Sequence, residues 1–223
     1  MWRRRGLLAL AALPGKPARA AEIDLLLALA VDASGSVSEG RFLLQRQGYA
    51  DAFRAPRLHR AIRSGPAGAI AVAMFQWTGP QLQSDVADWT RLAGPADAIA
   101  FARNIEATPR ALFGGGTSIS GAIDHARRLI TRAPIQAPRR VIDVSGDGHN
   151  NRGREATEAR DDAVAAGITI NGLPILALEP ELDVHYRDEV IGGPGAFMIP
   201  VASFEAFGEA VLRKLVTEIA SLD

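Results

Sequence analysis

The chain has 223 residues, 48% of them hydrophobic, and its 25 basic and 25 acidic side chains leave no formal net charge at pH 7. A chain of this length buries a sizeable core and favours one domain. The sequence contains no cysteine, which excludes disulfide bonds, thiolate metal sites and catalysis by a thiol. Its stability must therefore come from the hydrophobic core.

Residues 1–20 resemble a secretory signal peptide. A basic start precedes a short apolar stretch, and a small-x-small pattern at Ala18 and Ala20 precedes the expected cleavage site. The apolar stretch is too short to span a bilayer. We therefore expect export to the periplasm or out of the cell, with residues 21–223 as a single domain. The alternative is a basic tail with no targeting role.

Removal of residues 1–20 leaves 20 basic and 25 acidic side chains. An acidic mature chain argues against nucleic acid, and against an anionic membrane surface, as its partner. We expect no transmembrane segment once the signal peptide is removed.

Strand and helix patterns alternate along the rest of the chain. The apolar run at 25–31 has no polar alternation, which predicts a strand buried on both faces. Further strands are expected at 68–77, 81–89, 139–148, 168–176 and 196–201, and helices at 38–55, 58–62, 95–106, 119–132, 154–166 and 203–219. The order predicts a three-layer α/β/α doubly wound fold with a mainly parallel sheet, in which the segment at 81–89 is an antiparallel edge strand.

Three loops carry oxygen side chains that suit a metal ion. Asp32, Ser34 and Ser36 follow the first strand, Thr117 lies in a loop of three glycines, and Asp147 follows the strand that begins at residue 139. Ligands of parallel sheets bind at the carboxyl ends of the strands, so we expect these loops to lie together. Carboxylates and hydroxyls without imidazole or thiolate favour Mg²⁺, Mn²⁺ or Ca²⁺ over zinc.

Each of these residues also has a structural interpretation. Ser36 with Glu39 fits a helix capping box, and Thr117 fits a simple N-cap. Asp147 with the glycine after it fits a tight turn. Asp32 fits a role in stabilising the next helix through its dipole.

Three nearby polar residues are weaker candidates. Asp143, inside an apolar strand, is either a second acid that supports Asp147 or a hydrogen-bonded structural acid. His149 and Asn150 are candidates for the rim of the site, with an ordinary polar loop as the alternative.

Trp77 ends the second strand and fits the core or the hairpin better than a contact surface.

Taken together, the loops resemble the metal-ion-dependent adhesion site of the von Willebrand factor A domain. That motif is Asp-x-Ser-x-Ser, a later Thr and a later Asp-Gly, in the order found here, and the resemblance covers about residues 22–221. The segments at 139–148 and 186–197 look like a family of exported bacterial proteins within that superfamily, which comes with no assigned activity. In one departure, Ser145 and Gly146 replace a bulkier residue and Thr, and we expect a looser third loop.

The resemblance implies that Ser34, Ser36 and Thr117 give hydroxyl oxygens to the metal directly, whereas Asp32 and Asp147 act mainly through bound water. It also implies a divalent cation, Mg²⁺ first and Mn²⁺ or Ca²⁺ next, that attracts an acidic side chain of a partner protein. Such a binding module needs no catalytic base, so we expect no enzymatic activity.

The alternatives are a hydrolase or phosphatase that uses the same metal, and a fold whose site is idle. Against an enzyme, the first loop lacks the second Asp of a phosphatase-type loop. The sequence also has no Gly-x-Ser-x-Gly elbow and no Gly-x-x-x-x-Gly-Lys phosphate loop.

Overall fold

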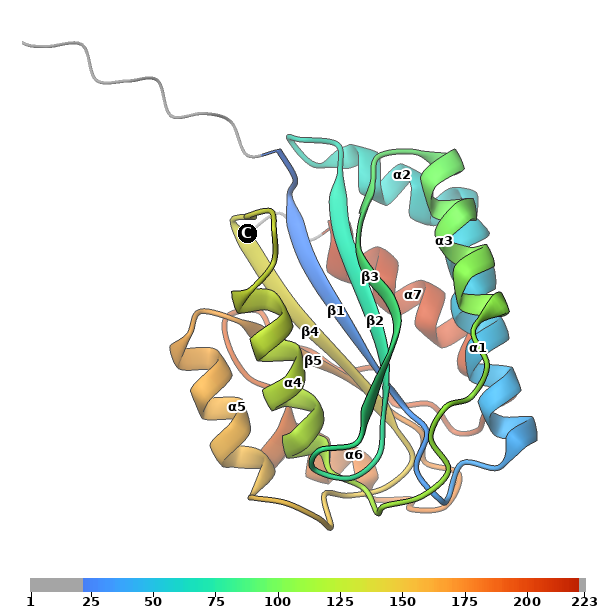
Figure 1. Ribbon diagram of the computed structural model, residues 1–223, viewed down its shortest axis with the longest axis vertical. Helices are drawn as coiled ribbons and strands as arrows, with labels where there is room; N and C mark the ends of the chain where they lie inside the picture. Colours follow the sequence, from blue (N-terminus) through green and yellow to red (C-terminus); the bar gives the residue numbers. More distant parts are fainter. Residues whose placement is uncertain (1–21, 221–223) are drawn as a thin grey trace, which may run out of the picture.

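The computed structural model describes residues 22–220, so the expected signal peptide lies outside the described residues. Its five strands form one sheet in the order β3-β2-β1-β4-β5 (Figure 1). The strands are β1 (Leu25–Asp32), β2 (Ile70–Trp77), β3 (Gln83–Leu92), β4 (Arg139–Gly146) and β5 (Thr169–Pro174). β1 pairs in parallel with β2 and β4, β4 with β5, and β3 runs antiparallel to β2. The predicted mainly parallel sheet with an antiparallel edge is confirmed.

Helices cover both faces of the sheet (Figure 1). One face carries α1 (Glu39–Arg54), α2 (Pro56–Ser64), α3 (Pro95–Ala107) and α7 (Phe207–Ala220), and the other carries α4 (Ile119–Thr131), α5 (Ala156–Ala165), the short α6 (Leu182–His185) and a π-helical turn at Tyr186–Val190. Alternate residues of β1 enter separate cores on the two faces. This double burial explains why its sequence shows no polar alternation.

Two predictions near the C-terminus need correction. The segment at 196–201 is not a regular strand, because it meets β5 only through single bridges such as Gly172 to Met198 and Ile175 to Val201. Pro200 lies inside this segment and has no N–H to donate to a ladder. The last helix begins at Phe207 rather than at residue 203, because a turn comes first.

The sheet order places a topological switch point at the carboxyl ends of β1 and β4. The chain leaves β1 for β2 on one side, and β4 later adds on the other side, so the direction of winding changes between them. Such a switch point is where open α/β sheets bind ligands. Among residues 22–220, no helix is long and apolar enough to cross a membrane.

Candidate metal site

The structure brings the first and third predicted loops together at this switch point. Asp32 ends β1, and its Oδ2 accepts a hydrogen bond from the backbone N–H of Asp147, just after β4, at 3.3 Å. Ser36 Oγ donates to Asp147 Oδ1 at 2.5 Å, and Ser34 Oγ lies 3.1 Å from Ser36 Oγ. Four of the five predicted ligands therefore form one hydrogen-bonded group.

The second loop brings Thr117 to the same place. A Cβ atom built on Gly148 would lie 3.7 Å from Thr117 Oγ1, so the hydroxyl lies beside the third loop. Asn151 joins the two loops: its Oδ1 accepts from the Thr117 N–H at 2.9 Å, and its own N–H donates to the Thr117 carbonyl at 2.9 Å. All five predicted residues thus meet at one end of the sheet.

The capping interpretations of Ser36 and Thr117 are wrong. The N-cap of α1 is Ser38, whose side chain accepts from the backbone of Arg41. The N-cap of α4 is Ser118, whose side chain accepts from the backbone of Gly121. Each helix is capped by the next hydroxyl residue along the chain, so neither Ser36 nor Thr117 is a helix cap.

The two acids of the site are buried close to one another. Burial, and then the charge of Asp147, raise the pKa of Asp32 to about 7. Burial also raises the pKa of Asp147, against the hydrogen bond from Ser36 and the charge of Arg41. Asp147 Oδ2 is buried and has no hydrogen-bond partner among the described residues. Two buried carboxylates with an open oxygen are unfavourable unless a cation neutralises them.

The donor set therefore fits a hard divalent cation. It offers two carboxylates and three hydroxyls, the oxygen ligands that Mg²⁺, Mn²⁺ and Ca²⁺ take. Within residues 22–220 there is no group of three or more His, Asp or Glu side chains placed to hold a metal. A site on this chain consequently depends on the hydroxyls of the loops.

Arg110 and Gln45 hold the first loop, and the sequence analysis missed both. Arg110 Nη2 donates to the carbonyls of Ala33 and Ser34 at 2.9 and 3.0 Å, and Gln45 Nε2 donates to the carbonyl of Asp32 at 3.2 Å. All three acceptors are backbone carbonyls, which any sequence supplies. No motif therefore marked these residues.

The third loop is packed rather than loosened by Gly146. A Cβ atom here would lie 3.0 Å from Asp32 Oδ2 and from the Tyr186 hydroxyl, and 3.2 Å from the Trp77 ring. Both aromatic side chains are fully buried. Trp77 therefore belongs to the core, as predicted, and with Tyr186 it fills the space that a larger residue at position 146 would take.

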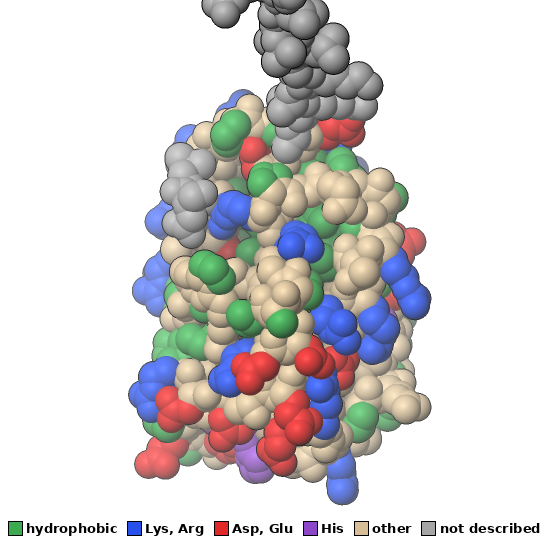
Figure 2. Space-filling model, turned by 90° about the vertical axis from the view of Figure 1, so that its left-hand side faces the viewer, with side chains coloured by type: hydrophobic (Ala, Val, Ile, Leu, Met, Phe, Trp, Pro, Cys, Tyr) green, Lys and Arg blue, Asp and Glu red, His purple; other side chains and the backbone are tan. Residues whose placement is uncertain are grey.

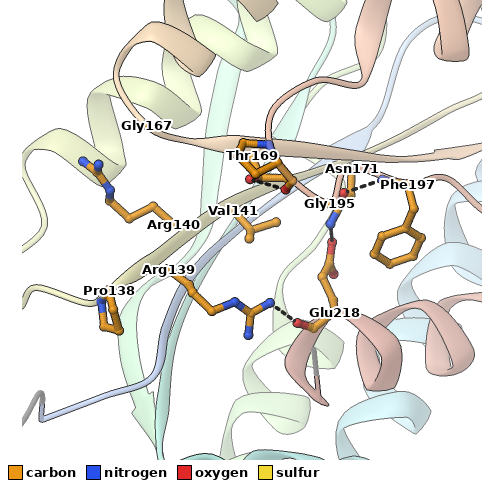
Figure 3. A pocket seen from close by; sticks show the side chains of 11 residues that line it. Pro138, Arg139, Arg140, Val141, Gly167, Thr169, Asn171, Gly195, Phe197 and Glu218 are labelled. Atoms are coloured by element: carbon orange, nitrogen blue, oxygen red, sulfur yellow. Dashed lines mark hydrogen bonds between the residues drawn. The ribbon is translucent and has the colours of Figure 1, made fainter. Parts of the chain in front are cut away.

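Asp143 belongs to a different cluster, on the side of the sheet that α7 covers. Its Oδ1 lies 2.6 Å from Nζ of the buried Lys214, which also donates to Glu218 Oε1 at 3.0 Å. Asn171 Nδ2 donates to the same Glu218 oxygen at 2.6 Å, at the wall of a cleft of about 220 Å³ near the amino ends of β4 and β5 (Figure 3). Arg139 Nη2 donates to the Glu218 carbonyl at 2.6 Å. The structural interpretation of Asp143 is the one that these contacts favour.

His149 and Asn150 lie just beyond Asp147 and do different things. His149 is exposed, and its Nδ1 lies 3.1 Å from the carboxylate of Glu179. Asn150 instead ties the loop to α4, because its Oδ1 accepts from the Ser120 N–H at 3.1 Å. Figure 2 shows acidic side chains and a histidine toward the lower end of the molecule, the end to which the parallel strands β1, β2, β4 and β5 run in Figure 1.

Comparison with solved structures identifies the fold. The chain is similar to proximal thread matrix protein 1 from the mussel byssus, with 13% identity and a TM-score of 0.66 over 90% of this chain and 49% of that one. A second structure of that protein, described as having a zinc-occupied MIDAS motif, has 16% identity and a TM-score of 0.62 over 89% of this chain and 46% of that one. This chain thus spans about half of the mussel protein.

Two bacterial pilus proteins show the same likeness. The pilus adhesin SpaC from Lactobacillus rhamnosus GG has 15% identity and a TM-score of 0.63 over 89% of this chain and 30% of that one. The von Willebrand factor domain of the pilus tip protein Mfa5 from Porphyromonas gingivalis has 8% identity and a TM-score of 0.58 over 90% of this chain and 98% of that one. Identities this low establish the fold alone.

Comparison by sequence identifies the family. A search of curated proteins gave no match. A family profile matches residues 22–223, which is nearly the whole chain. The chain, with a von Willebrand factor A fold, therefore belongs to the family described as Protein of unknown function (DUF1194).

Proposed function

We propose that this chain is a metal-dependent protein-binding module of the adhesion type. It holds a divalent cation with Asp32, Ser34, Ser36, Thr117 and Asp147, and through that cation it binds an acidic side chain of a partner protein. The observation that carries the proposal is the buried pair Asp32 and Asp147, which three loops surround with hydroxyls and for which no buried basic side chain of the described residues is a partner.

The chemistry of the donors favours Mg²⁺, with Mn²⁺ and Ca²⁺ as alternatives. When bound, the cation supplies an electron-poor centre that accepts the oxygen of an acidic ligand. The residues of the chain position the cation. Arg110 and Gln45 fix the backbone of the first loop, and Asn151 fixes Thr117. Such a preorganised set binds without a large ordering cost.

The comparisons support a role in adhesion outside the cytoplasm. The similar proteins include a byssus matrix protein and a pilus adhesin, as their names say. For this chain, export rests on the resemblance of residues 1–20 to a signal peptide.

The surface beside the site offers an anchor for a protein partner. Phe113 lies in the loop that leads to Thr117, and 69% of it is exposed. Its ring is stacked 4.9 Å from the guanidinium of Arg110, the residue that holds the carbonyl of Ser34. Exposed aromatic side chains held in place are frequent anchors of protein interfaces. We propose that the partner contacts Phe113 while its acid binds the metal.

Thermal unfolding of the full chain tests the metal site. The wild type and Asp32→Ala are compared in EDTA, Mg²⁺, Mn²⁺ and Ca²⁺, with Asp161→Ala as the control because Asp161 is exposed on α5. A cation that binds only the folded state raises the midpoint. We expect the rise in the wild type and the control and its loss in Asp32→Ala. An equal response of all three proteins would contradict the site, and metal-dependent phosphatase turnover lost in Asp32→Ala would contradict a binding-only role.

A further inference from the structure

Arg41 places a positive charge at the edge of the candidate metal site. It lies in the first turn of α1, and its Nη1 is 3.8 Å from Asp147 Oδ2, the buried oxygen without a hydrogen-bond partner among residues 22–220. The same Nη1 donates to the Ser36 carbonyl at 3.0 Å. The guanidinium therefore contacts two of the three loops that form the site, although no motif in the sequence includes it.

The position of this guanidinium is fixed, yet it remains accessible. Its carbon lies 5.1 Å from the centre of the buried Phe204 ring, which supports one face of the group. The Arg41 side chain is still 31% exposed. A guanidinium has five N–H donors, and one hydrogen bond from Arg41 to a described residue is found, to Ser36. Donors remain for a ligand that approaches from solvent.

We propose that Arg41 determines the ligand specificity of the site by binding the same partner carboxylate that the metal binds. This inference rests on the proposed function. A guanidinium and a carboxylate match in a two-pronged geometry that neutral oxygen ligands cannot reproduce. Arg41 thereby selects a Glu or Asp side chain over an amide or hydroxyl, which the metal alone discriminates less sharply.

The same charge affects the metal in the opposite direction. Arg41 partly neutralises Asp147 while the site has no cation, and it repels a cation that enters. Without a ligand, it therefore lowers the affinity for the metal. Once a carboxylate is present, its negative charge lies between two positive groups and Arg41 raises the affinity for the ligand. A single substitution of Arg41 should consequently strengthen the binding of the metal and weaken the binding of the ligand.

The test uses the full chain and two separate titrations. The dissociation constant of Mn²⁺ is measured first with the metal alone. In saturating Mn²⁺, the protein is then titrated with N-acetylglutamic acid amide, and with N-acetylglutamine amide as the uncharged match. The variants are Arg41→Gln, Arg41→Lys and Arg46→Gln. Arg46 is the matched control because it lies on the same helix but donates to the Thr108 carbonyl.

We expect Arg41→Gln to bind Mn²⁺ about threefold more tightly, as a partly exposed pair of charges allows. The same variant should bind the glutamic acid probe about tenfold more weakly, the loss of a charge-assisted hydrogen bond. Arg41→Lys should keep the Mn²⁺ affinity of the wild type and lose part of the affinity for the probe. Arg46→Gln should match the wild type in both titrations.

Other results would overturn the inference in recognisable ways. Tighter Mn²⁺ binding with unchanged probe binding would leave Arg41 as a counter-charge alone. Weaker binding in both titrations would give it a merely structural role. Equal binding of the glutamic acid and glutamine probes to the wild type would remove the selectivity while sparing the metal site. Failure of the wild type to bind Mn²⁺ would overturn the proposed function itself, and this inference with it.

Discussion

Residues 22–220 contain two buried pairs of acids, and the pairs differ in how their charge is balanced. Asp143 and Glu218 share the ammonium group of Lys214, which is as deeply buried as they are. Asp32 and Asp147 have no such partner among the described residues, and the nearest guanidinium, on the partly exposed Arg41, lies 3.8 Å from Asp147. Asp143 lies on β4 and Glu218 on α7, whereas Asp32 ends β1 and Asp147 follows β4 directly.

This difference separates a structural cluster from a site. A buried acid is costly unless it is paired, so a fold that needs only stability supplies its own cation. The pair at the switch point, Asp32 and Asp147, instead keeps a charge that a cation from solution can balance. Natural proteins often give up stability in this way at functional sites. The comparison can be tested by removing Lys214 from the first cluster or the carboxylate charge of Asp32 from the second.

Loss of Lys214 should have the largest effect. Lys214→Met leaves Asp143 and Glu218 buried without their cation, and removal of one partner from a buried ion pair typically costs about 3–5 kcal/mol. We expect this loss in the free energy of unfolding, measured with urea at pH 7. Addition of Asp143→Asn and Glu218→Gln to the same chain should restore most of it. A loss of less than about 1 kcal/mol from Lys214→Met would show that the ion pair is unimportant.

The pH dependence of stability should come next. Burial and the charge of Asp143 raise the pKa of Glu218 to about 7, although Lys214 and Asn171 act to lower it. The charge of Glu218 in turn contributes to the raised pKa of Tyr49 on α1. The folded state then binds the proton of Glu218 more tightly than the unfolded state. The contribution of Glu218 to stability in EDTA should therefore be fully present at low pH and be lost as the pH rises from about 4.5 to 7, by up to a factor of about ten per pH unit in the folding equilibrium constant.

Glu218→Gln isolates this contribution, because glutamine keeps a hydrogen-bond acceptor for Asn171 and does not titrate. The variant should show a shallower fall over the same pH range, with a residual slope from Asp32, whose raised pKa acts in the same direction. A slope that stays the same in Glu218→Gln would mean that Glu218 is already charged at low pH.

Removal of the charge at the other cluster should give the opposite pattern. Asp32→Asn keeps an oxygen that can accept from the Ser34 N–H and gives up the longer hydrogen bond from the Asp147 N–H, but it removes the repulsion with Asp147. In EDTA at pH 8 we expect the variant to be more stable than the wild type. In Mg²⁺ the order should reverse, because the wild type alone gains about 2.7 kcal/mol at a hundredfold excess over the dissociation constant. Calorimetry at both conditions checks the reversal, and a wild type more stable in both would contradict it.

The sequence predicted the five strands of the sheet and the five candidate ligands because both leave local signals, whereas the strand expected at 196–201 is only a pair of isolated bridges. Apolar runs ending in Asp32 and just before Asp147 mark strands and their carboxyl ends, where sheets of this kind bind ligands. The residues that support the site have no such local signal. Arg110 binds backbone carbonyls from a distant loop. Tyr186 belongs to a helical segment whose sequence is mostly polar, although its own side chain is buried. Lys214 and Glu218 lie one helical turn apart on α7, a spacing that ordinarily marks an exposed pair rather than a buried one.

The smallest effect on stability is expected at Ser36, and it decides between the two roles that the sequence left open for this residue. A helix cap costs about 1 kcal/mol when it is replaced by alanine, but the cap of α1 is Ser38. In EDTA, Ser36→Ala should therefore lose only the hydrogen bond to Asp147 Oδ1, which is worth about 1 kcal/mol in the free energy of unfolding, and Ser38→Ala should show the cost of a lost cap. The response to Mg²⁺ should separate the two variants, because the stabilisation is lost in Ser36→Ala and kept in Ser38→Ala. Parallel urea titrations of both variants with and without Mg²⁺ measure both effects. A loss of stability without a loss of metal response in Ser36→Ala would return this residue to a structural role and leave the candidate site one ligand short.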